Sequence, residues 1–363
     1  MVSKDTLGIF VVFSLLGVCL TIVLIAEWAD KESTPPITKV QVHNQAELNF
    51  HVIGDFAQFD SSKLIEGKEP VQLVAEQMKE LALYNPIQMI VSTGDNRYPY
   101  SNSAFDQVIY RYLYRTFNLP GLSHKPWYLV LGNHDCREDP SYEVDANNLY
   151  PAWNMPSPYF NFSVNVDQGK VGFVFMDGCN LYKENRITQK DKQQLDWADE
   201  TLNYYNSNPE YLWKIVNIHM PVFSASDHGD NQNLKKYLYP ILQKHSVDVV
   251  LSGHEHCMEH LASQNSTLTP KPKCRGSKIT TEYLKSKNST SWTKGQAIHQ
   301  VVQGAGGKEL YKLCPTKVTS MAQLYFGYCN YGFSQVTINS KLLRVDYYLY
   351  NSSEPVYSFK ITN

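Results

Sequence analysis

The sequence predicts an α/β fold built around a largely parallel β-sheet. Five short apolar runs each lead into a polar side chain, and such runs are typical of buried strands. Helix-like stretches lie between them, near residues 70–84, 104–117, 189–206 and 231–245. Strands that alternate with helices indicate βαβ units and therefore a parallel sheet. The five runs are LNFHVIGD, IQMIVSTGD, PWYLVLGNH, WKIVNIH and VDVVLSGHEH.

The chain changes character after residue 261. Residues 262–296 are rich in Ser, Thr, Lys and Asn, and we expect a solvated insertion there. Strand-like runs without intervening helices follow, and this spacing favours an antiparallel sheet that closes the same domain. We therefore expect one domain from 47 to 363. The four later runs are AIHQVVQG, FSQVTINS, KLLRVDYYLY and VYSFKIT.

Residues 1–29 are typical of an export segment. Residues 7–26 contain no charged side chain, and a helix of that length can cross a bilayer. A cleavable signal peptide usually has a shorter apolar core, about 7–15 residues. We therefore favour an uncleaved anchor that holds the protein to the membrane, with a signal peptide as the alternative. Residues 30–46 are polar and contain a Pro-Pro pair, which indicates a linker.

Glycosylation sequons and cysteines favour a secretory-pathway location, with the domain lumenal or extracellular. The protein would then be a single-pass membrane, secreted or lysosomal protein. Six of the seven cysteines lie beyond the apolar span, and an oxidising compartment would allow up to three disulfides among them. We expect disulfides at Cys274, Cys314 and Cys329; buried free thiols remain an alternative for Cys136, Cys179 and Cys257. The predicted glycosylation sites are Asn161, Asn265, Asn288 and Asn351.

The overall composition is that of a globular protein. Of 363 residues, 43% are hydrophobic and 19% charged, and the formal net charge is −2. This balance argues against a nucleic-acid partner. It also means that an anionic substrate must be captured by a local positive site.

Metal-binding residue types stand at the ends of all five runs. In open α/β sheets, ligands bind beyond the carboxyl ends of the strands, so we expect these side chains to converge. A carboxylate can bridge two ions, and neutral imidazoles suit zinc or iron. A single Gly-Asp pair or a single histidine would be a weak signal, but the complete series predicts a polynuclear metal site. The candidate ligands are Asp55, Asp95, Tyr98, Asn133, His219, His254 and His256.

The series resembles the metallophosphoesterase superfamily and, within it, the purple acid phosphatases of the small, tartrate-resistant type. The matching segments are Gly94-Asp95-Asn96-Arg97-Tyr98, Gly132-Asn133-His134-Asp135, Val216-Asn217-Ile218-His219 and Gly253-His254-Glu255-His256. One block departs from the family pattern, because Ala57 follows Asp55-Phe56 where the family has glycine. Other metallophosphoesterases place a histidine ligand at that position, and here Tyr98 would replace it.

This resemblance implies a four-layer fold of two mixed β-sheets that pack face to face between helices. It also implies Fe(III) together with a second divalent metal, either Fe, Zn or Mn. A phenol binds as phenolate to a strongly Lewis-acidic ion, which favours Fe(III) beside Tyr98. Asp55, Tyr98 and His256 would hold Fe(III), and Asp95 would bridge. Asn133, His219 and His254 would hold the second ion.

The implied activity is that of an acid phosphatase, a metal-dependent hydrolase of phosphate monoesters. A metal-bound hydroxide would attack phosphorus, and a nearby side chain would supply a proton to the leaving group. His134 and His228 resemble the family's substrate-facing histidines, Asn133 would also contact substrate, and Asp135 could orient His134. For Arg97, a surface salt bridge is favoured over a phosphate contact.

Several alternatives and expectations accompany this assignment. Another metallophosphoesterase activity, on nucleotides or phosphodiesters, is the main alternative, and a non-catalytic membrane-tethered binding protein is the second. We expect the substrate to be a small phosphate ester or a phosphoprotein. We also expect the protein to be a monomer.

Overall fold

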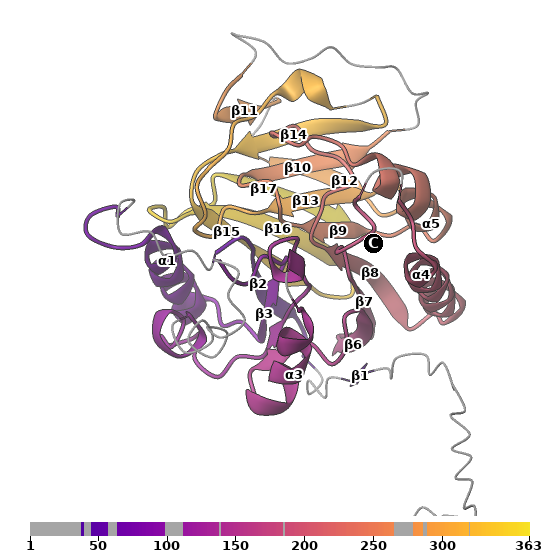
Figure 1. Cartoon of the computed structure of the whole chain (residues 1–363), viewed down its shortest axis with the longest axis horizontal. Coiled ribbons are helices and arrows are strands. Elements are labelled where there is room, and N and C mark those ends of the chain that lie inside the picture. Colours follow the sequence, from indigo (N-terminus) through magenta and orange to yellow (C-terminus); the bar gives the residue numbers. More distant parts are fainter. Residues whose placement is uncertain are drawn as a thin grey trace, which may run out of the picture. The chain divides into compact units, whose positions relative to one another are not determined.

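The computed structural model describes residues 38–39, 45–56, 64–98, 112–137, 139–183, 186–264, 279–285, 289–318 and 320–363. The elements below all belong to one compact unit, residues 35–363 (Figure 1). Within the described ranges, no helix has the length and hydrophobicity needed to cross a membrane. The predicted span 7–26 lies outside those ranges, as does Ala57.

Two mixed β-sheets form the centre of the unit. Among the described residues, one sheet has nine strands in the order β1-β6-β7-β8-β9-β13-β10-β14-β11, and the other has eight in the order β12-β17-β16-β15-β2-β3-β4-β5. The nine strands are β1 (Thr38–Lys39), β6 (Phe160–Val166), β7 (Gly169–Met176), β8 (Tyr211–Ile218), β9 (Val249–Ser252), β13 (His299–Gln303), β10 (Met258–Ser263), β14 (Ala322–Tyr328) and β11 (Glu282–Leu284). The eight are β12 (Ser289–Thr293), β17 (Tyr357–Thr362), β16 (Leu342–Leu349), β15 (Gly332–Ile338), β2 (Leu48–Ile53), β3 (Met89–Ser92), β4 (Trp127–Tyr128) and β5 (Trp153–Asn154).

Each sheet contains a parallel group, which corrects the expectation of a single parallel core. Strands β2, β3, β4 and β5 pair in parallel in one sheet, and β7, β8, β9 and β13 pair in parallel in the other. The first three predicted runs therefore belong to one sheet and the last two to the other. The fold of two mixed sheets implied by the family resemblance is confirmed.

The sheets pack face to face through aromatic side chains. Phe50 of β2 meets Phe173 of β7 edge to face, with ring centroids 5.8 Å apart, and Tyr128 of β4 stacks on Phe162 of β6 at 4.2 Å. Successive side chains on a strand point to opposite faces. Phe173 therefore joins this inner core, whereas Val174 packs in a second cluster with residues of the outer helices.

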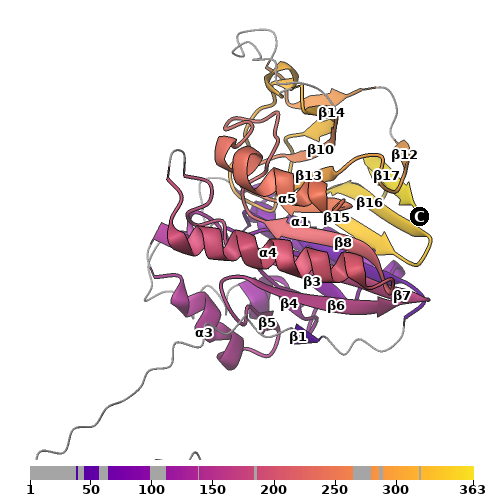
Figure 2. The ribbon, with the colours of Figure 1, turned by 90° about the vertical axis from the view of Figure 1, so that its right-hand side faces the viewer.

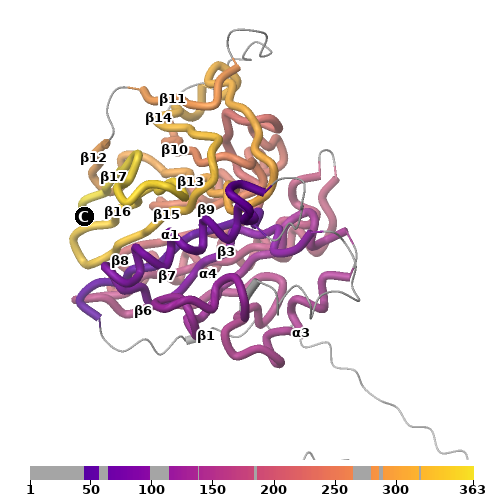
Figure 3. The backbone as a smooth tube through the Cα atoms, turned by 90° about the vertical axis from the view of Figure 1, so that its left-hand side faces the viewer, coloured from indigo at the N-terminus to yellow at the C-terminus, as the bar shows by residue number. Residues whose placement is uncertain are grey.

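Helices cover the outer faces of both sheets. Helix α1 (Pro70–Tyr84) lies on the side of the eight-stranded sheet, and α4 (Gln189–Ser207) and α5 (Tyr239–Lys244) lie on the side of the nine-stranded sheet. Figures 2 and 3 view these two sides from opposite directions. A capping box starts α4, because Thr188 Oγ1 accepts the Asp191 N–H at 3.2 Å and Asp191 Oδ2 accepts the Thr188 N–H at 2.7 Å.

The helix predictions near 70–84 and 189–206 are confirmed by α1 and α4. The stretch 231–245 divides into a π-helical turn, η5 (Leu234–Leu238), and α5. Of 104–117, the described part contains another π-helical turn, η3 (Tyr112–Thr116). Three short helices were not predicted: η4 (Asp135–Arg137), α3 (Ser141–Leu149) and η7 (Pro315–Lys317).

The later part of the chain also departs from expectation. Strand β13 joins the nine-stranded sheet, whereas β15, β16 and β17 are antiparallel neighbours in the other. The segment 262–296 is more than a solvated insertion: β11 pairs with β14 and β12 pairs with β17, so it adds an edge strand to each sheet.

Disulfides connect segments that are far apart in the sequence. Cys136 is bonded to Cys179, and Cys257 to Cys329. Cys314 is disulfide-bonded as well, whereas Cys274 lies outside the described residues. The free-thiol alternative is therefore wrong for Cys136, Cys179 and Cys257.

The structure distinguishes among the four sequons. Asn351 is exposed. Asn161 is only 3% exposed, and its Oδ1 accepts a hydrogen bond from the Tyr205 hydroxyl at 3.3 Å. A glycan at Asn161 would require this buried side chain to be exposed, and glycosylation there stays a prediction. Asn265 and Asn288 lie outside the described residues.

Candidate metal centre

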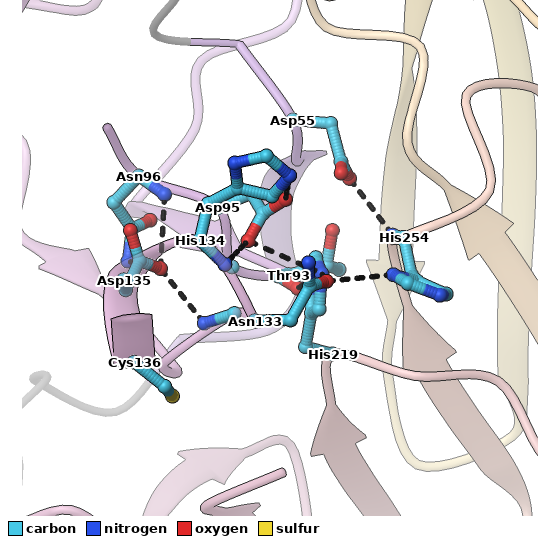
Figure 4. A network of polar contacts seen from close by, with 12 residues as sticks. Asp55, Thr93, Asp95, Asn96, Asn133, His134, Asp135, Cys136, His219 and His254 are labelled. Atoms are coloured by element: carbon cyan, nitrogen blue, oxygen red, sulfur yellow. Dashed lines mark hydrogen bonds and ion pairs between the residues drawn. The ribbon is translucent and has the colours of Figure 1, made fainter. Parts of the chain in front are cut away.

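The carboxyl ends of the two parallel groups meet at one site. Asp55 follows β2, Asp95 follows β3 and Asn133 follows β4 in the eight-stranded sheet. His219 follows β8, while His254 and His256 follow β9 in the other sheet. Figure 4 shows most of these side chains turned toward one another. The predicted convergence therefore occurs between two sheets rather than along one.

Unusual backbone conformations bring these side chains together. Asp55, Asp95 and His254 have positive φ angles of 55°, 51° and 67°, a conformation that costs non-glycine residues roughly 1–3 kcal/mol and clusters at functional sites. Glycine permits close approach beside them. A Cβ on Gly94, whose φ is +96°, would lie 2.6 Å from His219 Nδ1, and one on Gly132 would lie 2.1 Å from Asp95 Oδ1.

One group of ligand atoms surrounds the Tyr98 hydroxyl. The Tyr98 hydroxyl donates to Asp95 Oδ2 at 2.5 Å and lies 3.4 Å from Asp55 Oδ1. His256 Nε2 lies 3.5 Å from the same Asp55 oxygen. All four side chains are buried. Two carboxylates, a phenol and an imidazole thus face a common point.

A second group surrounds the amide oxygen of Asn133. Asn133 Oδ1 lies 3.1 Å from His219 Nε2 and 2.8 Å from His254 Nδ1. His219 Nε2 is also 3.4 Å from Asp95 Oδ1. Asn133 and His254 are only partly buried, so this group is the one that opens toward solvent.

Asp95 belongs to both groups through different oxygens. Its Oδ2 faces Tyr98 and its Oδ1 faces His219. Ligand atoms bound to one ion at about 2.0–2.2 Å stand roughly 3 Å apart, which matches the spacings within each group. A carboxylate with one oxygen in each of two ligand sets is suited to bridge two ions.

Contacts with backbone carbonyl oxygens indicate which nitrogen of a histidine ring can bind metal. His219 Nδ1 lies 2.7 Å from the Thr93 carbonyl oxygen, and His256 Nδ1 lies 2.6 Å from that of Glu309. A ring nitrogen that donates to a carbonyl leaves the other nitrogen free to bind metal. Nε2 is therefore the free nitrogen of both rings, while in His254 it is Nδ1 that faces Asn133.

Burial sets the electrostatics of the site. Burial raises the pKa of Asp55 and Asp95 well above the usual range and lowers the pKa of His219 to about 3 and of His256 to about 4. The pKa of His254 is lowered well below its usual value for the same reason. Metals bind neutral imidazoles and ionised carboxylates. The rings are thus already in the binding form, and a cation would supply the charge that these buried carboxylates need, so the residues fit a metal centre.

Asp135 supports the site differently from the prediction. Its Oδ2 accepts the N–H groups of Gly132 at 2.7 Å and Asn96 at 3.1 Å, and its Oδ1 accepts that of Arg97 at 3.2 Å. Burial raises the pKa of Asp135 to about 7. Asp135 therefore joins the loop of Asp95 to the loop of Asn133. These contacts make it a structural residue, not one that orients His134.

Arg97 is also buried, contrary to the favoured surface salt bridge. Its guanidinium donates to the Asp135 carbonyl oxygen at 3.2 Å, and its Nε lies 3.4 Å from Glu143 Oε1. Only 1% of Arg97 is exposed. It supports the ligand loops from behind and does not face the site.

His134 lies against the first group of ligands. Its backbone N–H donates to Asp95 Oδ1 at 2.8 Å, and its ring centroid is 4.4 Å from that of Tyr98. Burial, followed by the nearby charges of Arg137 and Lys308, lowers the pKa of His134 to about 3. Its imidazole is therefore neutral over the ordinary pH range.

His228 stands at the open side of the second group. Its ring centroid is 4.4 Å from that of His254, and its side chain is 52% exposed. A hydrogen bond to Glu255 raises the pKa of His228 above its usual value. The ring borders a cleft of about 430 Å³ that also reaches Asn133, Tyr182, Lys183 and Met220.

Several supporting residues were missed from the sequence. Glu255 contacts His228, Thr93 and Glu309 contact ligand histidines through their carbonyl oxygens, and the Tyr311 ring stacks on His256 at 4.0 Å. Only Glu255 carried a signal, because it stands between the two histidines of the GHEH segment. The others act through backbone atoms or come from a distant loop, so no motif indicates them.

Comparisons with known proteins agree with this geometry. Purple acid phosphatase 3 of Arabidopsis thaliana is 28% identical over 314 residues, which cover 83% of this chain and 74% of the relative. Tartrate-resistant acid phosphatase type 5 of Sus scrofa is 27% identical over 60% of this chain and 66% of its own length. The predicted resemblance to these phosphatases is confirmed.

Solved structures share the fold at lower identity. A purple acid phosphatase from yellow lupin (Lupinus luteus) seeds has a TM-score of 0.60 at 16% identity, covering 88% of this chain and 54% of its own. A protein described as the anchor in the inner membrane complex of Plasmodium has a TM-score of 0.65 at 17% identity, covering 88% and 89%. The family model described as calcineurin-like phosphoesterase matches residues 48–258. The chain therefore belongs to the calcineurin-like phosphoesterase family.

Proposed function

We propose that this chain is an acid phosphatase that hydrolyses phosphate monoesters at a dinuclear Fe(III)–M(II) centre. The observation that carries the proposal is the position of Asp95, whose two oxygens belong to two separate ligand groups. The names of the relatives as purple and tartrate-resistant acid phosphatases support the same activity.

The donor atoms favour different metals at the two positions. Asp55, Tyr98 and His256 would hold Fe(III), because a phenolate prefers a trivalent, strongly Lewis-acidic ion. Asn133, His219 and His254 would hold a divalent Fe, Zn or Mn ion, with Asp95 between the two. When bound, the metal pair would neutralise the phosphate oxygens and make a water nucleophilic.

The side chains around this pair have separable tasks. His228 borders the cleft beside His254 and has a raised pKa, so at acid pH it can bind a phosphate oxygen or protonate the leaving group. The pKa of His134 is lowered by burial, which favours hydrogen bonding to substrate over proton donation for this side chain. Asn133, placed between His219 and His254, would also help to position substrate.

The cleft accepts the part of the substrate beyond phosphate. Tyr182, Lys183 and Met220 line it, and its open side fits a small phosphate ester or a side chain of a phosphoprotein. The disulfides support a compartment that is oxidising, such as the secretory pathway, the cell exterior or the lysosome. A monomer and a membrane anchor remain our expectations.

Two other functions would use the same fold. A nucleotide or phosphodiester hydrolase needs similar metals. The cleft, and not the set of metal ligands, would therefore distinguish that activity from hydrolysis of small phosphate monoesters. The Plasmodium protein described as an anchor shares the fold, and a non-catalytic, membrane-tethered binding role is the second alternative for the present chain. The complete, converging ligand set of the present chain favours catalysis over that role.

The test compares p-nitrophenyl phosphate with bis(p-nitrophenyl) phosphate at acid pH. We expect the purified full chain to hydrolyse the monoester with a much higher kcat/KM, and Asp95→Asn to abolish this activity. A preference for the diester would support the first alternative. A metal-loaded wild-type chain without either activity would support the non-catalytic one.

A further inference from the structure

We propose that Glu255 is a positioning residue that fixes the His228 imidazole at the cleft. This inference rests on the proposed function, because it concerns how a substrate-facing side chain is held. It assigns a task to the acidic residue between the two ligand histidines of the GHEH segment. That residue would couple the metal-binding segment to the loop that faces the substrate.

Glu255 lies on a rigid support. It is fully buried, its N–H donates to the Gly253 carbonyl oxygen at 2.8 Å, and the Cys257 N–H donates to its own carbonyl oxygen at 2.6 Å. The Cys257–Cys329 disulfide holds the chain two residues further along. A Cβ on Gly304 would lie 2.2 Å from the Glu255 carbonyl oxygen, so only glycine allows this close packing. The backbone that carries the Glu255 carboxylate is therefore held in one position.

One carboxylate contacts both the backbone and the ring of His228. The His228 N–H donates to Glu255 Oε1 at 3.1 Å and lies 3.3 Å from Oε2, and the ring Nδ1 is 3.4 Å from Oε1. An exposed side chain normally samples several rotamers, and holding it in one costs conformational entropy. Since Nδ1 faces Glu255, the opposite nitrogen, Nε2, is the one left for substrate.

Other groups lie beside His228, but their described contacts do not join its backbone N–H to its ring as the Glu255 carboxylate does. The rings of His254 and Tyr311 pack beside it, with centroids at 4.4 Å and 5.5 Å. Asp227 and Lys317 contribute nearby charges of opposite sign. Ring packing limits where the imidazole can move, but it does not select which nitrogen faces the cleft. The Glu255 contact does so.

Glu259, at the start of β10 and four residues after Glu255, offers a matched control. It is fully buried, its Oε1 accepts from the Ser224 hydroxyl and its Oε2 from the Ala225 N–H, both at 2.7 Å. Its carboxylate therefore anchors the loop that carries His228 through Ser224 and Ala225. A glutamine at position 259 can donate to the hydroxyl and accept from the N–H, so it preserves this anchor.

The experiment measures kcat and KM for glycerol 2-phosphate, which has a poor leaving group, and for p-nitrophenyl phosphate, which has a good one. Glu255→Ala should lower kcat for glycerol 2-phosphate by about 10–100-fold, the usual range for supporting residues around a metal site, and should affect p-nitrophenyl phosphate less. Glu255→Gln, which keeps an acceptor for the His228 N–H, should restore most of the loss. Glu259→Gln should leave the ratio of the two substrates unchanged.

A double-mutant cycle tests whether Glu255 acts through His228. In the His228→Ala background, Glu255→Ala should cause less than a roughly twofold further loss, because the group that it positions is gone. Equal losses in both backgrounds, at unchanged metal content, would overturn the proposal. If Glu255→Ala loses metal, Glu255→Asp replaces it: a shortened carboxylate should shift the substrate ratio in the same direction, and a wild-type ratio would overturn the proposal.

The outcome separates this inference from the proposed function. A wild-type chain with bound metals and no hydrolysis of either ester would overturn both. An active wild type whose Glu255 and His228 variants act independently would overturn this inference alone.

Discussion

Replacing Asp135 distinguishes a structural support from a catalytic side chain. In Asp135→Ala, the N–H groups of Gly132, Asn96 and Arg97 lose their shared acceptor in a fully buried place. An unsatisfied buried donor costs about 1–3 kcal/mol, so three of them imply a loss of roughly 5 kcal/mol. For a chain of this size, that corresponds to a fall in Tm on the order of 10 °C.

The same change should release metal. Asp95 and Asn133 stand on the two loops that Asp135 joins, so both metal positions should lose occupancy together. Urea unfolding followed by tryptophan fluorescence gives the stability, and elemental analysis gives the metal content. Asp135→Asn keeps one acceptor oxygen and should lie between the wild type and Asp135→Ala in both measurements.

His134→Ala serves as the control, because its partly exposed ring can be removed without opening the loops. We expect it to lower activity while stability and metal content stay near those of the wild type. The reasoning would be refuted if Asp135→Ala remained as stable and as metal-rich as the wild type yet lost activity to the same degree as His134→Ala. That result would restore the role predicted from the sequence, in which Asp135 orients His134.

Three further predictions concern the metal site and its surroundings. Tyr98→Phe should remove the visible absorption band of a tyrosinate–iron complex, and a band that persists in the variant would exclude Tyr98 as the iron ligand. Gly94→Ala, which places a methyl group 2.6 Å from His219 Nδ1 at a φ of +96°, should lower activity by about 10–100-fold; unchanged kinetics would show that His219 can move freely. Burial, followed by the charge of Glu255, raises the pKa of Glu259 from 4.5 to about 8, so the stability that this group contributes is complete below pH 4.5 and is lost as pH rises toward 8. As pH rises from 4.5 to 8, Glu259→Gln should therefore become more stable than the wild type, by roughly 5 kcal/mol in total. Urea unfolding at several pH values measures this difference, and the same pH profile for both proteins would contradict the raised pKa of Glu259.

The positions of the ligands could be predicted from the sequence because each follows a buried strand. The apolar runs before Asp55, Asp95, Asn133, His219 and His254 do form or lead out of strands. The distribution of those strands between two sheets could not be read from the runs themselves, since pairing partners depend on packing between distant segments. The family resemblance, not the periodicity, indicated the two sheets.

Supporting contacts were harder to predict for a physical reason. Asp135 stands beside His134 in the sequence, yet its carboxylate turns toward the backbone N–H groups of two loops. Side-chain direction in a turn depends on local φ and ψ angles, which a motif does not encode. Asn161 shows the same limit, because the pattern of a sequon does not reveal that its side chain is buried beside Tyr205.

The central claim is that Asp55, Asp95 and Tyr98 hold a trivalent iron beside a second metal. Elemental analysis of the purified full chain, combined with its visible spectrum, tests this most directly. The account predicts two metal ions per chain, at least one of them iron, and a coloured protein. A chain that carries two metals and is colourless, or that contains no iron, would contradict it.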